Sequence, residues 1–445
     1  MANLLHGSIH KIYFKYLATC FGSALIICIY SLVDMIAVGQ YEGPDGTAAL
    51  TTVLPLWSTI FSLGTLFGIG GSVLMSSARG AGDKERGDQF FTAASIGVAV
   101  IAATAWLVTL FFDRQMLMLF GARGSFLELG LRYVFCIKLV LPLFILTPFL
   151  TAFIRNDHAP GLATIAVVAG GGFNIFGDIF FVFVCDMGVF GAGLATALGQ
   201  VITTIIVLLH FVTKKCQLRF VRPHHFFRKI GSIFTTGFSA FIVDVASGIL
   251  VILFNNQIMV YADSNALAVY GVASNVAALV QACGAGIGQA AQPILSTNYG
   301  AGKTKRVQKT LLLGTATALF LGLLVAIATM LFPTPLVNLF MDATPEVLSI
   351  APPILRVYFL SFLLLPFNIF SSYYFQAILH AKLSLLLSIC RGIAVSGVLI
   401  FLLPTIFGAD ALWWVMILAE SVTASLALCF LLRNRRRALP IPSKE

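Results

Sequence analysis

Two short stretches decide the fold of this chain: Arg79-Gly80-Ala81-Gly82-Asp83-Lys84 and Tyr299-Gly300-Ala301-Gly302-Lys303-Thr304. Each Gly-Ala-Gly follows a long apolar run and opens a basic loop, and the two lie 220 positions apart. The same offset joins other pairs: Gly68 with Gly288, Gly172 with Gly392, Gly177 with Gly397, and Thr203 with Thr423. Self-similarity at a fixed offset predicts two copies of one structural unit.

The composition places both copies in a membrane. Hydrophobic residues make up 59% of the 445 and charged residues only 10%, whereas a soluble domain has about 25% charged residues. Apolar stretches of about 20 residues, long enough to cross a bilayer as helix, recur throughout. We predict twelve spans, at 14–38, 50–76, 90–112, 131–154, 161–184, 190–212, 230–256, 267–296, 310–332, 350–379, 383–403 and 410–432. A β-barrel would need shorter segments of alternating polarity.

We therefore expect an all-α integral membrane protein with two six-helix lobes. The predicted parts are an N-lobe at 1–213, a basic loop at 214–229, a C-lobe at 230–432 and a basic tail at 433–445. Most of the 28 Lys and Arg fall in loops on one side, which by the positive-inside rule puts both termini in the cytoplasm. The net charge of +10 thus indicates topology and contact with lipid head groups, and not nucleic-acid binding.

Ionisable residues within spans are costly in hydrocarbon and are candidates for function. In the first half, Asp34 lies near the outer end of its span, and Asp178 lies in the outer half of 161–184. Asn174 precedes Asp178 by four residues and so shares its helix face. Thr196 and Lys138 lie at a comparable depth in their own spans. We predict that Asp34, Asn174, Asp178 and Thr196 form a cation site, with Lys138 as a tethered counter-ion.

Two coupling ions remain open for this cluster. Hard oxygen ligands suit Na⁺, and two neighbouring carboxylates in a low dielectric also suit a proton. A purely structural role, as loop caps or hydrogen bonds between helices, is the alternative. The second copy has Ala394, Val398 and Met416 at the positions of Asn174, Asp178 and Thr196, which favours a single ion site in the first half.

The second half carries different polar residues. Acids and aromatic rings in a cavity attract lipophilic cations, whereas polar packing between helices is the alternative explanation. Arg391 could pair with Asp244 or Glu420, the two acids within these spans, or extend toward the membrane interface. The candidates for a substrate cavity are Asp244, Asn255, Asn256, Tyr270, Gln281 and Glu420.

Several segments together resemble the bacterial multidrug and toxic compound extrusion (MATE) family over essentially the whole chain. They are the end of span 1 (Val33-Asp34-Met35-Ile36-Ala37-Val38-Gly39), both Gly-Ala-Gly turns, Asn174-Ile175-Phe176-Gly177-Asp178, and the entry to span 6 from Gly188 to Thr196. The resemblance implies two pseudo-symmetric six-helix lobes in a bacterial plasma membrane. It implies export of organic, often cationic, compounds in exchange for Na⁺ or H⁺. It also implies that Asp34, Asn174, Asp178 and Thr196 bind the ion.

We further expect a monomer with no cofactor beyond the coupling ion, whose partners are small organic substrates and the lipid bilayer. The runner-up function is a flippase for a lipid-linked oligosaccharide or another amphiphile, from the same superfamily. An enzyme is not expected, because neither metal-ligand spacing nor a nucleophile elbow is present.

Overall fold

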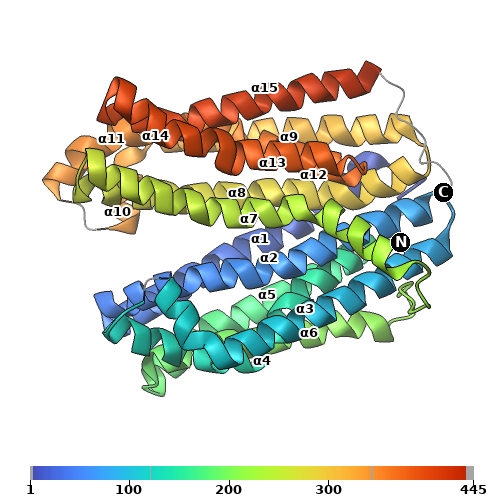
Figure 1. The fold of residues 1–445 in the computed structure, drawn as a ribbon, viewed down its shortest axis with the longest axis horizontal. Coiled ribbons are helices and arrows are strands. Elements are labelled where there is room, and N and C mark those ends of the chain that lie inside the picture. Colours follow the sequence, from blue (N-terminus) through green and yellow to red (C-terminus); the bar gives the residue numbers. More distant parts are fainter. Residues whose placement is uncertain (1–3, 121, 342–343, 437–445) are drawn as a thin grey trace. The chain divides into compact units, whose positions relative to one another are not determined.

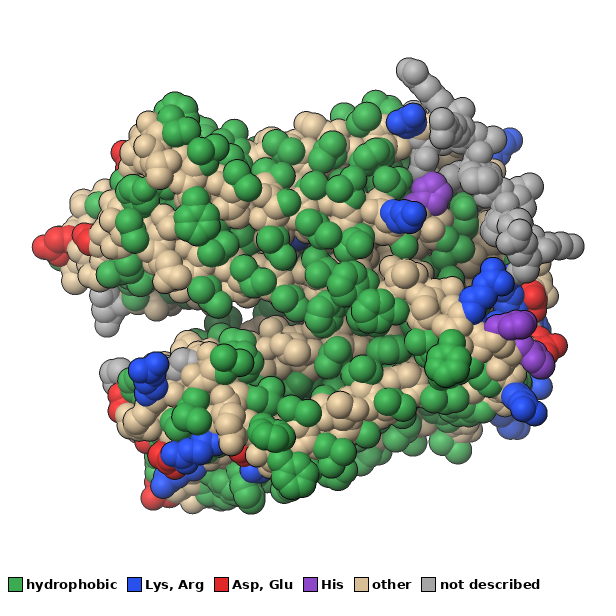
Figure 2. Space-filling model, viewed as in Figure 1, with side chains coloured by type: hydrophobic (Ala, Val, Ile, Leu, Met, Phe, Trp, Pro, Cys, Tyr) green, Lys and Arg blue, Asp and Glu red, His purple; other side chains and the backbone are tan. Residues whose placement is uncertain are grey.

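The computed structural model describes residues 4–120, 122–341 and 344–436, and within these ranges every regular element is a helix (Figure 1). Twelve of the described helical segments are long and apolar enough to span a membrane. The predicted all-α class with twelve spans is therefore confirmed. Helices suit this environment because all their backbone polar groups are satisfied within the segment. Hydrophobic side chains cover the visible flanks, and charged side chains gather near helix ends (Figure 2).

The chain divides into two compact units, and each is described by itself. The first unit contains Ala18–Phe241, and the second combines Leu4–Leu17 with the residues from Ile242 onward. The first turns of the helix that begins each repeat are therefore assigned to the unit that contains most of the other repeat.

The helices of the first repeat follow one another through short turns. The π-helical segment continues α5 directly, and a short 3₁₀ segment ends α6. In chain order the elements are α1 (Ile9–Glu42), α2 (Pro44–Gly80), α3 (Lys84–Leu119), α4 (Ser125–Asn156), α5 (Pro160–Gly177), η1 (Asp178–Val184), α6 (Gly188–Leu208) and η2 (Leu209–Val212).

The second repeat has the same order with more interruptions. Its tenth span is broken by a 3₁₀ turn, its eleventh by a π-helical segment, and an additional short helix, α10, precedes the tenth. In order the elements are α7 (Phe226–Tyr261), α8 (Ser264–Gly300), α9 (Thr304–Leu331), α10 (Pro333–Phe340), α11 (Pro345–Phe359), η3 (Leu360–Leu363), α12 (Leu365–Ala377), α13 (Ala381–Ile389), η4 (Cys390–Ala394), α14 (Val395–Phe407), η5 (Ala409–Trp414) and α15 (Val415–Arg436).

The two Gly-Ala-Gly stretches form the same helix-ending turn. Gly82 has φ +90° and Gly302 has φ +67°, a left-handed conformation that glycine adopts without a steric penalty. In both turns the next residue donates its backbone N–H to a carbonyl five residues earlier, Asp83 to Ala78 and Lys303 to Asn298, each at about 3 Å. This is the Schellman arrangement, which satisfies carbonyls at the end of a helix. The sequence repeat thus corresponds to a repeat of local structure.

Candidate cation site in the first unit

Five side chains from five helical elements of the first unit, α1, α4, α5, η1 and α6, form a polar cluster. The Tyr133 hydroxyl of α4 donates to Asp34 Oδ2 of α1 at 2.5 Å and lies 3.5 Å from Thr196 Oγ1 of α6. Asn174 Nδ2 of α5 donates to the same Thr196 oxygen at 3.0 Å. Asp178 follows one turn later as the first residue of η1, and its carboxyl group interacts electrostatically with Asp34.

The helix ends explain why these residues meet. Asp34 precedes the end of α1, and Tyr133 and Thr196 follow the starts of α4 and α6, each by about two turns. Asp178 precedes the end of η1 by a similar distance. Consecutive spans run in opposite directions, so these positions share one level. The four residues predicted from sequence therefore lie together, joined by Tyr133.

Close helix crossings hold the cluster. A Cβ atom at Gly193 of α6 would collide with the backbone carbonyl of Tyr133, and one at Gly177 would lie 2.8 Å from the Ala195 Cβ. Small residues at such positions let membrane helices approach closely. The positions of Tyr133 and Thr196 thus depend on glycines that neighbour them in space or sequence.

The cluster contains acceptor oxygens that no donor reaches. Asp34 Oδ1, Asn174 Oδ1 and both Asp178 carboxylate oxygens are buried without a hydrogen-bond partner. The Asp178 residue is 0% exposed and Asp34 is 9% exposed. Buried polar groups are nearly always paired, because burying them unpaired is strongly unfavourable. A small cation surrounded by these oxygens would satisfy them, and the donor set of carboxylate, amide and hydroxyl oxygen fits a hard cation or a proton.

Lys138 is not part of this cluster. Its ammonium group pairs with Asp113 Oδ2 of α3 at 2.5 Å, and its backbone carbonyl accepts from Trp106 Nε1 at 2.8 Å. Lys138 follows Tyr133 by five residues, which turns its side chain well away from the face that carries the tyrosine. Asp113 lies beyond the predicted end of span 3 but inside α3, beside the non-helical backbone of Phe112. The Lys138 charge is thus matched by Asp113 and not by the clustered acids.

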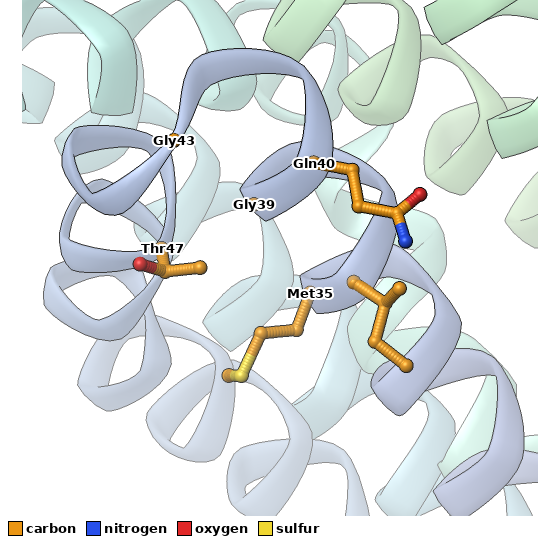
Figure 3. A pocket seen from close by; sticks show the side chains of 6 residues that line it. Met35, Gly39, Gln40, Gly43 and Thr47 are labelled. Carbon is orange, nitrogen blue, oxygen red and sulfur yellow. The ribbon is translucent and has the colours of Figure 1, made fainter. Parts of the chain in front are cut away.

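A shallow hollow of about 490 Å³ lies next to the cluster along the chain (Figure 3). Its walls come from the end of α1, directly after Asp34, and from the start of α2. The lining residues are Met35, Ile36, Gly39, Gln40, Gly43 and Thr47. Gln40 and Thr47 supply the polar side chains of this otherwise apolar hollow.

In the second unit, two of the predicted cavity residues join a buried network. Glu420 Oε1 of α15 accepts from Arg391 Nε at 2.8 Å, and Arg391 Nη2 donates to Gln281 Oε1 at 2.9 Å. Gln281 Nε2 donates to Ser247 Oγ at 2.9 Å, and Asn368 Nδ2 donates to Glu420 Oε2 at 2.6 Å. Asp244 and Glu420 were the two possible partners of Arg391, and the structure pairs it with Glu420.

The other predicted cavity residues lie apart from this network. Asp244 is half-buried on α7 and has no hydrogen-bond or ion-pair partner among the described residues. Asn255 is half-buried and Asn256 is exposed, both three turns further along α7. Tyr270 packs against the rings of Phe254 and Tyr358, at centroid distances of 4.9 and 6.0 Å. Asp244 is thus the acid of this group with a free carboxylate.

A second polar group of the first unit was not predicted from the sequence. Asp157, after α4, accepts from Arg79 at 2.9 Å, from His210 Nε2 at 2.8 Å, and from the backbone N–H of Gln217 at 2.8 Å. Arg79 also donates to the Gln217 carbonyl at 2.8 Å. Cys216 lies close enough to Asp157 and His210 to complete three potential metal ligands. Because the Asp157 oxygens already have these donors, the group fixes the start of the basic loop.

Few sequence signals point to these additional residues. Tyr133 could have been found by its depth, because a tyrosine within a span usually has a partner for its hydroxyl. Asp157 lies at a helix end with no distinguishing pattern, and its partners come from distant segments of the chain.

Among the described residues, twelve apolar helical spans in two repeats, with unsatisfied carboxylates inside them, are typical of a membrane transporter. The sequence profile of one family, MatE, matches residues 20–180 and 238–402, which is most of the chain. The chain belongs to the MatE family, and it is a multi-pass membrane transporter and not an enzyme.

Curated relatives match along nearly the full length. The chain is 26% identical over 421 residues to the multidrug export protein MepA of Staphylococcus saprophyticus, covering 93% of this chain and 91% of the relative. It is 27% identical over 420 residues to MepA of Staphylococcus aureus, covering 92% and 91%. These relatives carry the names of export proteins.

Solved structures share the fold. One is an outward-facing multidrug resistance MATE family transporter of the MOP superfamily, with a TM-score of 0.90, 22% identity and 98% coverage of both chains. Another is a MOP superfamily transporter from Pyrococcus furiosus, with the same score, identity and coverage, whose binding pocket is described as having reversed polarity and suggesting a different function. At this identity the likeness establishes the fold alone.

Proposed function

We propose that this protein is a secondary active antiporter that exports organic, often cationic and lipophilic, compounds in exchange for Na⁺ or H⁺. The observation that carries the proposal is the set of four buried acceptor oxygens without donors around Asp34 and Asp178. The names of the relatives, which are multidrug export proteins, supply the substrate class.

The coupling follows from charge. Without a cation, the Asp34 and Asp178 carboxylates repel each other in a low-dielectric site. A bound Na⁺ or proton removes this repulsion and draws α1, η1 and α6 toward the cluster. The π-helical segment beginning at Asp178 suits such a movement, because π-bulges disrupt regular helix bonding and occur frequently at functional sites. An ion that binds one conformation more tightly shifts the population toward it, and this is sufficient for antiport by alternating access.

The substrate site is proposed to involve the second unit's candidates, with Asp244 as the principal acid. Its carboxylate has no partner among the described residues, so it can attract a cationic compound without first breaking an ion pair. Asn255, Asn256 and Tyr270 would contribute polar and aromatic contacts, and Gln281 and Glu420 would act through their network. A lipophilic cation would gain from both the charge and the apolar surroundings.

The proposed topology has both termini in the cytoplasm of a bacterial cell and the protein in its plasma membrane as a monomer. The basic loops that follow the Gly-Ala-Gly turns support this orientation through the positive-inside rule. The cation cluster then lies near the outer surface, where an inwardly directed ion gradient can load it.

A flippase for lipid-linked oligosaccharides is the second candidate, because proteins of this fold are suggested to differ in function. Such a function needs free cationic side chains to hold a pyrophosphate. Lys138 and Arg391, two basic residues within predicted spans, are each paired with a carboxylate. This pairing supports the antiporter over the flippase.

The test is dye efflux from proteoliposomes that contain the purified protein, with either a Na⁺ or a pH gradient imposed. We expect one gradient to drive efflux of a cationic dye, and Asp34→Asn and Asp178→Asn each to abolish the driving effect. Asp113→Asn, in an ion pair outside the cluster, is the comparison variant. Efflux that neither gradient affects, or that persists unchanged in both cluster variants, would refute the proposal.

A further inference from the structure

The second unit contains a buried carboxylate whose charge is matched from within the protein. The Glu420 side chain is 0% exposed and that of Arg391 is 10% exposed, with Nε and Oε1 at 2.8 Å. The second carboxylate oxygen accepts from Asn368 Nδ2 at 2.6 Å. Both oxygens of Glu420 therefore have a donor, in contrast to both oxygens of Asp178.

The backbone presents the guanidinium group to this acid. Arg391 belongs to the π-helical segment η4, and its carbonyl accepts from Ser396 Oγ at 2.6 Å, five residues later. Arg391 also binds Gln281 on α8, which in turn binds Ser247 on α7. The guanidinium group is thus held by two partners, Glu420 and Gln281.

The first repeat has a neutral residue with different partners at the matching position. Gln200 stands at the position of Glu420, and its Nε2 donates to Thr147 Oγ1 at 2.6 Å and to the Leu143 carbonyl at 3.0 Å. The second repeat therefore has an acid, Glu420, where the first has an amide. At the same offset of 220 residues, it has Arg391 where the first has Gly171. The carboxylate and its cation therefore occur as a matched pair.

We propose, on the basis of the antiport function proposed above, that the Arg391 guanidinium is a built-in cation that takes the place of a free coupling ion in the second unit. Glu420 therefore adds no ion to the one that the Asp34–Asp178 cluster is proposed to bind. Without Arg391, Glu420 becomes a second site for a free cation, with Asn368 Oδ1 and Gln281 Oε1 as further oxygen ligands. Asn368 Oδ1 is buried and already lacks a donor, so this oxygen is available to a cation.

Counting ions tests the inference. Binding of ²²Na⁺ to the purified full chain at saturation gives the number directly. In Na⁺-free solution, protons released on adding tetraphenylphosphonium give the corresponding number. We expect one ion for the wild type, two for Arg391→Gln, and one for both Arg391→Lys and the double variant Arg391→Gln/Glu420→Gln. A merely structural role for Arg391 would change stability without changing the count.

A second variant covers the case in which Arg391→Gln folds poorly. Arg391→Ala leaves space for a free guanidinium ion, which at millimolar concentration should raise the melting temperature and return the count to one. The variant Arg391→Ala/Glu420→Gln should not respond, because a ligand stabilises only a folded state that binds it. If neither Na⁺, low pH nor guanidinium raises the melting temperature of Arg391→Gln or Arg391→Ala, the inference is wrong.

The outcomes separate this inference from the proposed function. Two ions in the wild type, or an unchanged count in folded Arg391→Gln, would overturn the role of Arg391 and leave the antiport function intact. Ion-driven efflux that survives Asp34→Asn and Asp178→Asn would instead overturn the proposed function, whatever the count for Arg391→Gln.

Discussion

The two units treat buried acids in opposite ways. In the first, Asp34 and Asp178 lie together with four acceptor oxygens that no donor reaches, Asn174 Oδ1 among them. In the second, Glu420 is enclosed by Arg391 and Asn368. A buried acid without a counter-charge needs a cation from outside, whereas one with a fixed guanidinium does not. The two repeats of one fold therefore differ, with the Asp34–Asp178 cluster of one open to an ion and the Glu420 site of the other closed to it.

The strongest way to break this comparison is to give the first cluster a cation of its own. In Thr196→Lys, the new ammonium group would lie among Asp34, Asn174 and Asp178 and displace the free ion. We expect ion-driven efflux to fall about 5–150-fold, the usual range of a coupling free energy. Thr196→Met, the residue found in the second repeat, is a control of similar length without charge. Equal efflux in the Lys and Met variants would contradict the account.

Removing one charge of the closed pair should affect stability most. Glu420→Gln leaves the buried Arg391 guanidinium unpaired, which should destabilise the protein by about 3–5 kcal/mol. Thermal unfolding in detergent measures the loss, with Arg391→Gln/Glu420→Gln as the neutral comparison. We expect the double variant to regain most of the stability. A double variant as unstable as Glu420→Gln would show that packing, and not charge, dominates at this site.

Packing at the open cluster can be tested through the α4–α6 crossing. Gly193→Ala forces the Tyr133 backbone away from α6, and overpacking of this kind destabilises by about 1–3 kcal/mol. Because the Tyr133 hydroxyl also binds Asp34, ion affinity should fall with stability. Gly172→Ala places its methyl group in open space and should change neither. An unchanged ion affinity in Gly193→Ala would separate Tyr133 from the ion site.

Removing a single neutral oxygen should have a smaller effect. Thr196→Val removes the hydroxyl that accepts from Asn174, a hydrogen bond worth about 0.5–1.5 kcal/mol. The ion concentration for half-maximal efflux should therefore rise about 2–10-fold. Thr203→Val is the matched control, because among the described residues its hydroxyl donates to the Gly199 carbonyl of its own helix and to no other group. Similar effects in both variants would refute a ligand role for Thr196.

The smallest expected effect concerns the turns after α4 and α12. Burial lowers the pKa of His158 below its usual 6.5, against the opposing effect of Asp157, and burial likewise lowers the pKa of His380. The unfolded chain then takes up these protons more readily, so stability is complete above pH 6.5 and declines as the pH falls below it. His158→Gln should flatten this decline by at most about 1.4 kcal/mol per pH unit.

Melting temperatures between pH 7.5 and 5 measure the decline. His224→Gln, at an exposed position in the basic loop, serves as the control. A pH profile for His158→Gln identical to the wild type would contradict the assignment of the acid sensitivity to this histidine.

Hydrophobicity and the repeat were sufficient to predict the helical class and the number of spans. The interruptions could not be predicted from the sequence, because η1 and η4 lie inside predicted spans and their irregular bonding depends on tertiary neighbours. The short helix α10 was missed for the opposite reason, since Pro333 ends the preceding apolar run and its eight residues are too few to span.

Depth along the bilayer could be predicted from sequence, but direction around each helix could not. Asp34, Asn174, Asp178 and Thr196 share a level and also face one another. Lys138 has the matching depth but points to Asp113, because its azimuth is set by the packing of α3 on α4. Arg391 had two acids within conceivable reach, and only the structure identifies Glu420.

The most direct test of the central claim is the number of coupling ions that the first unit binds. Equilibrium binding of ²²Na⁺, together with the proton release caused by a cationic substrate, should give one ion for the wild type. We predict none for Asp34→Asn/Asp178→Asn in folded protein that still binds the substrate. An unchanged ion count in that double variant would contradict it.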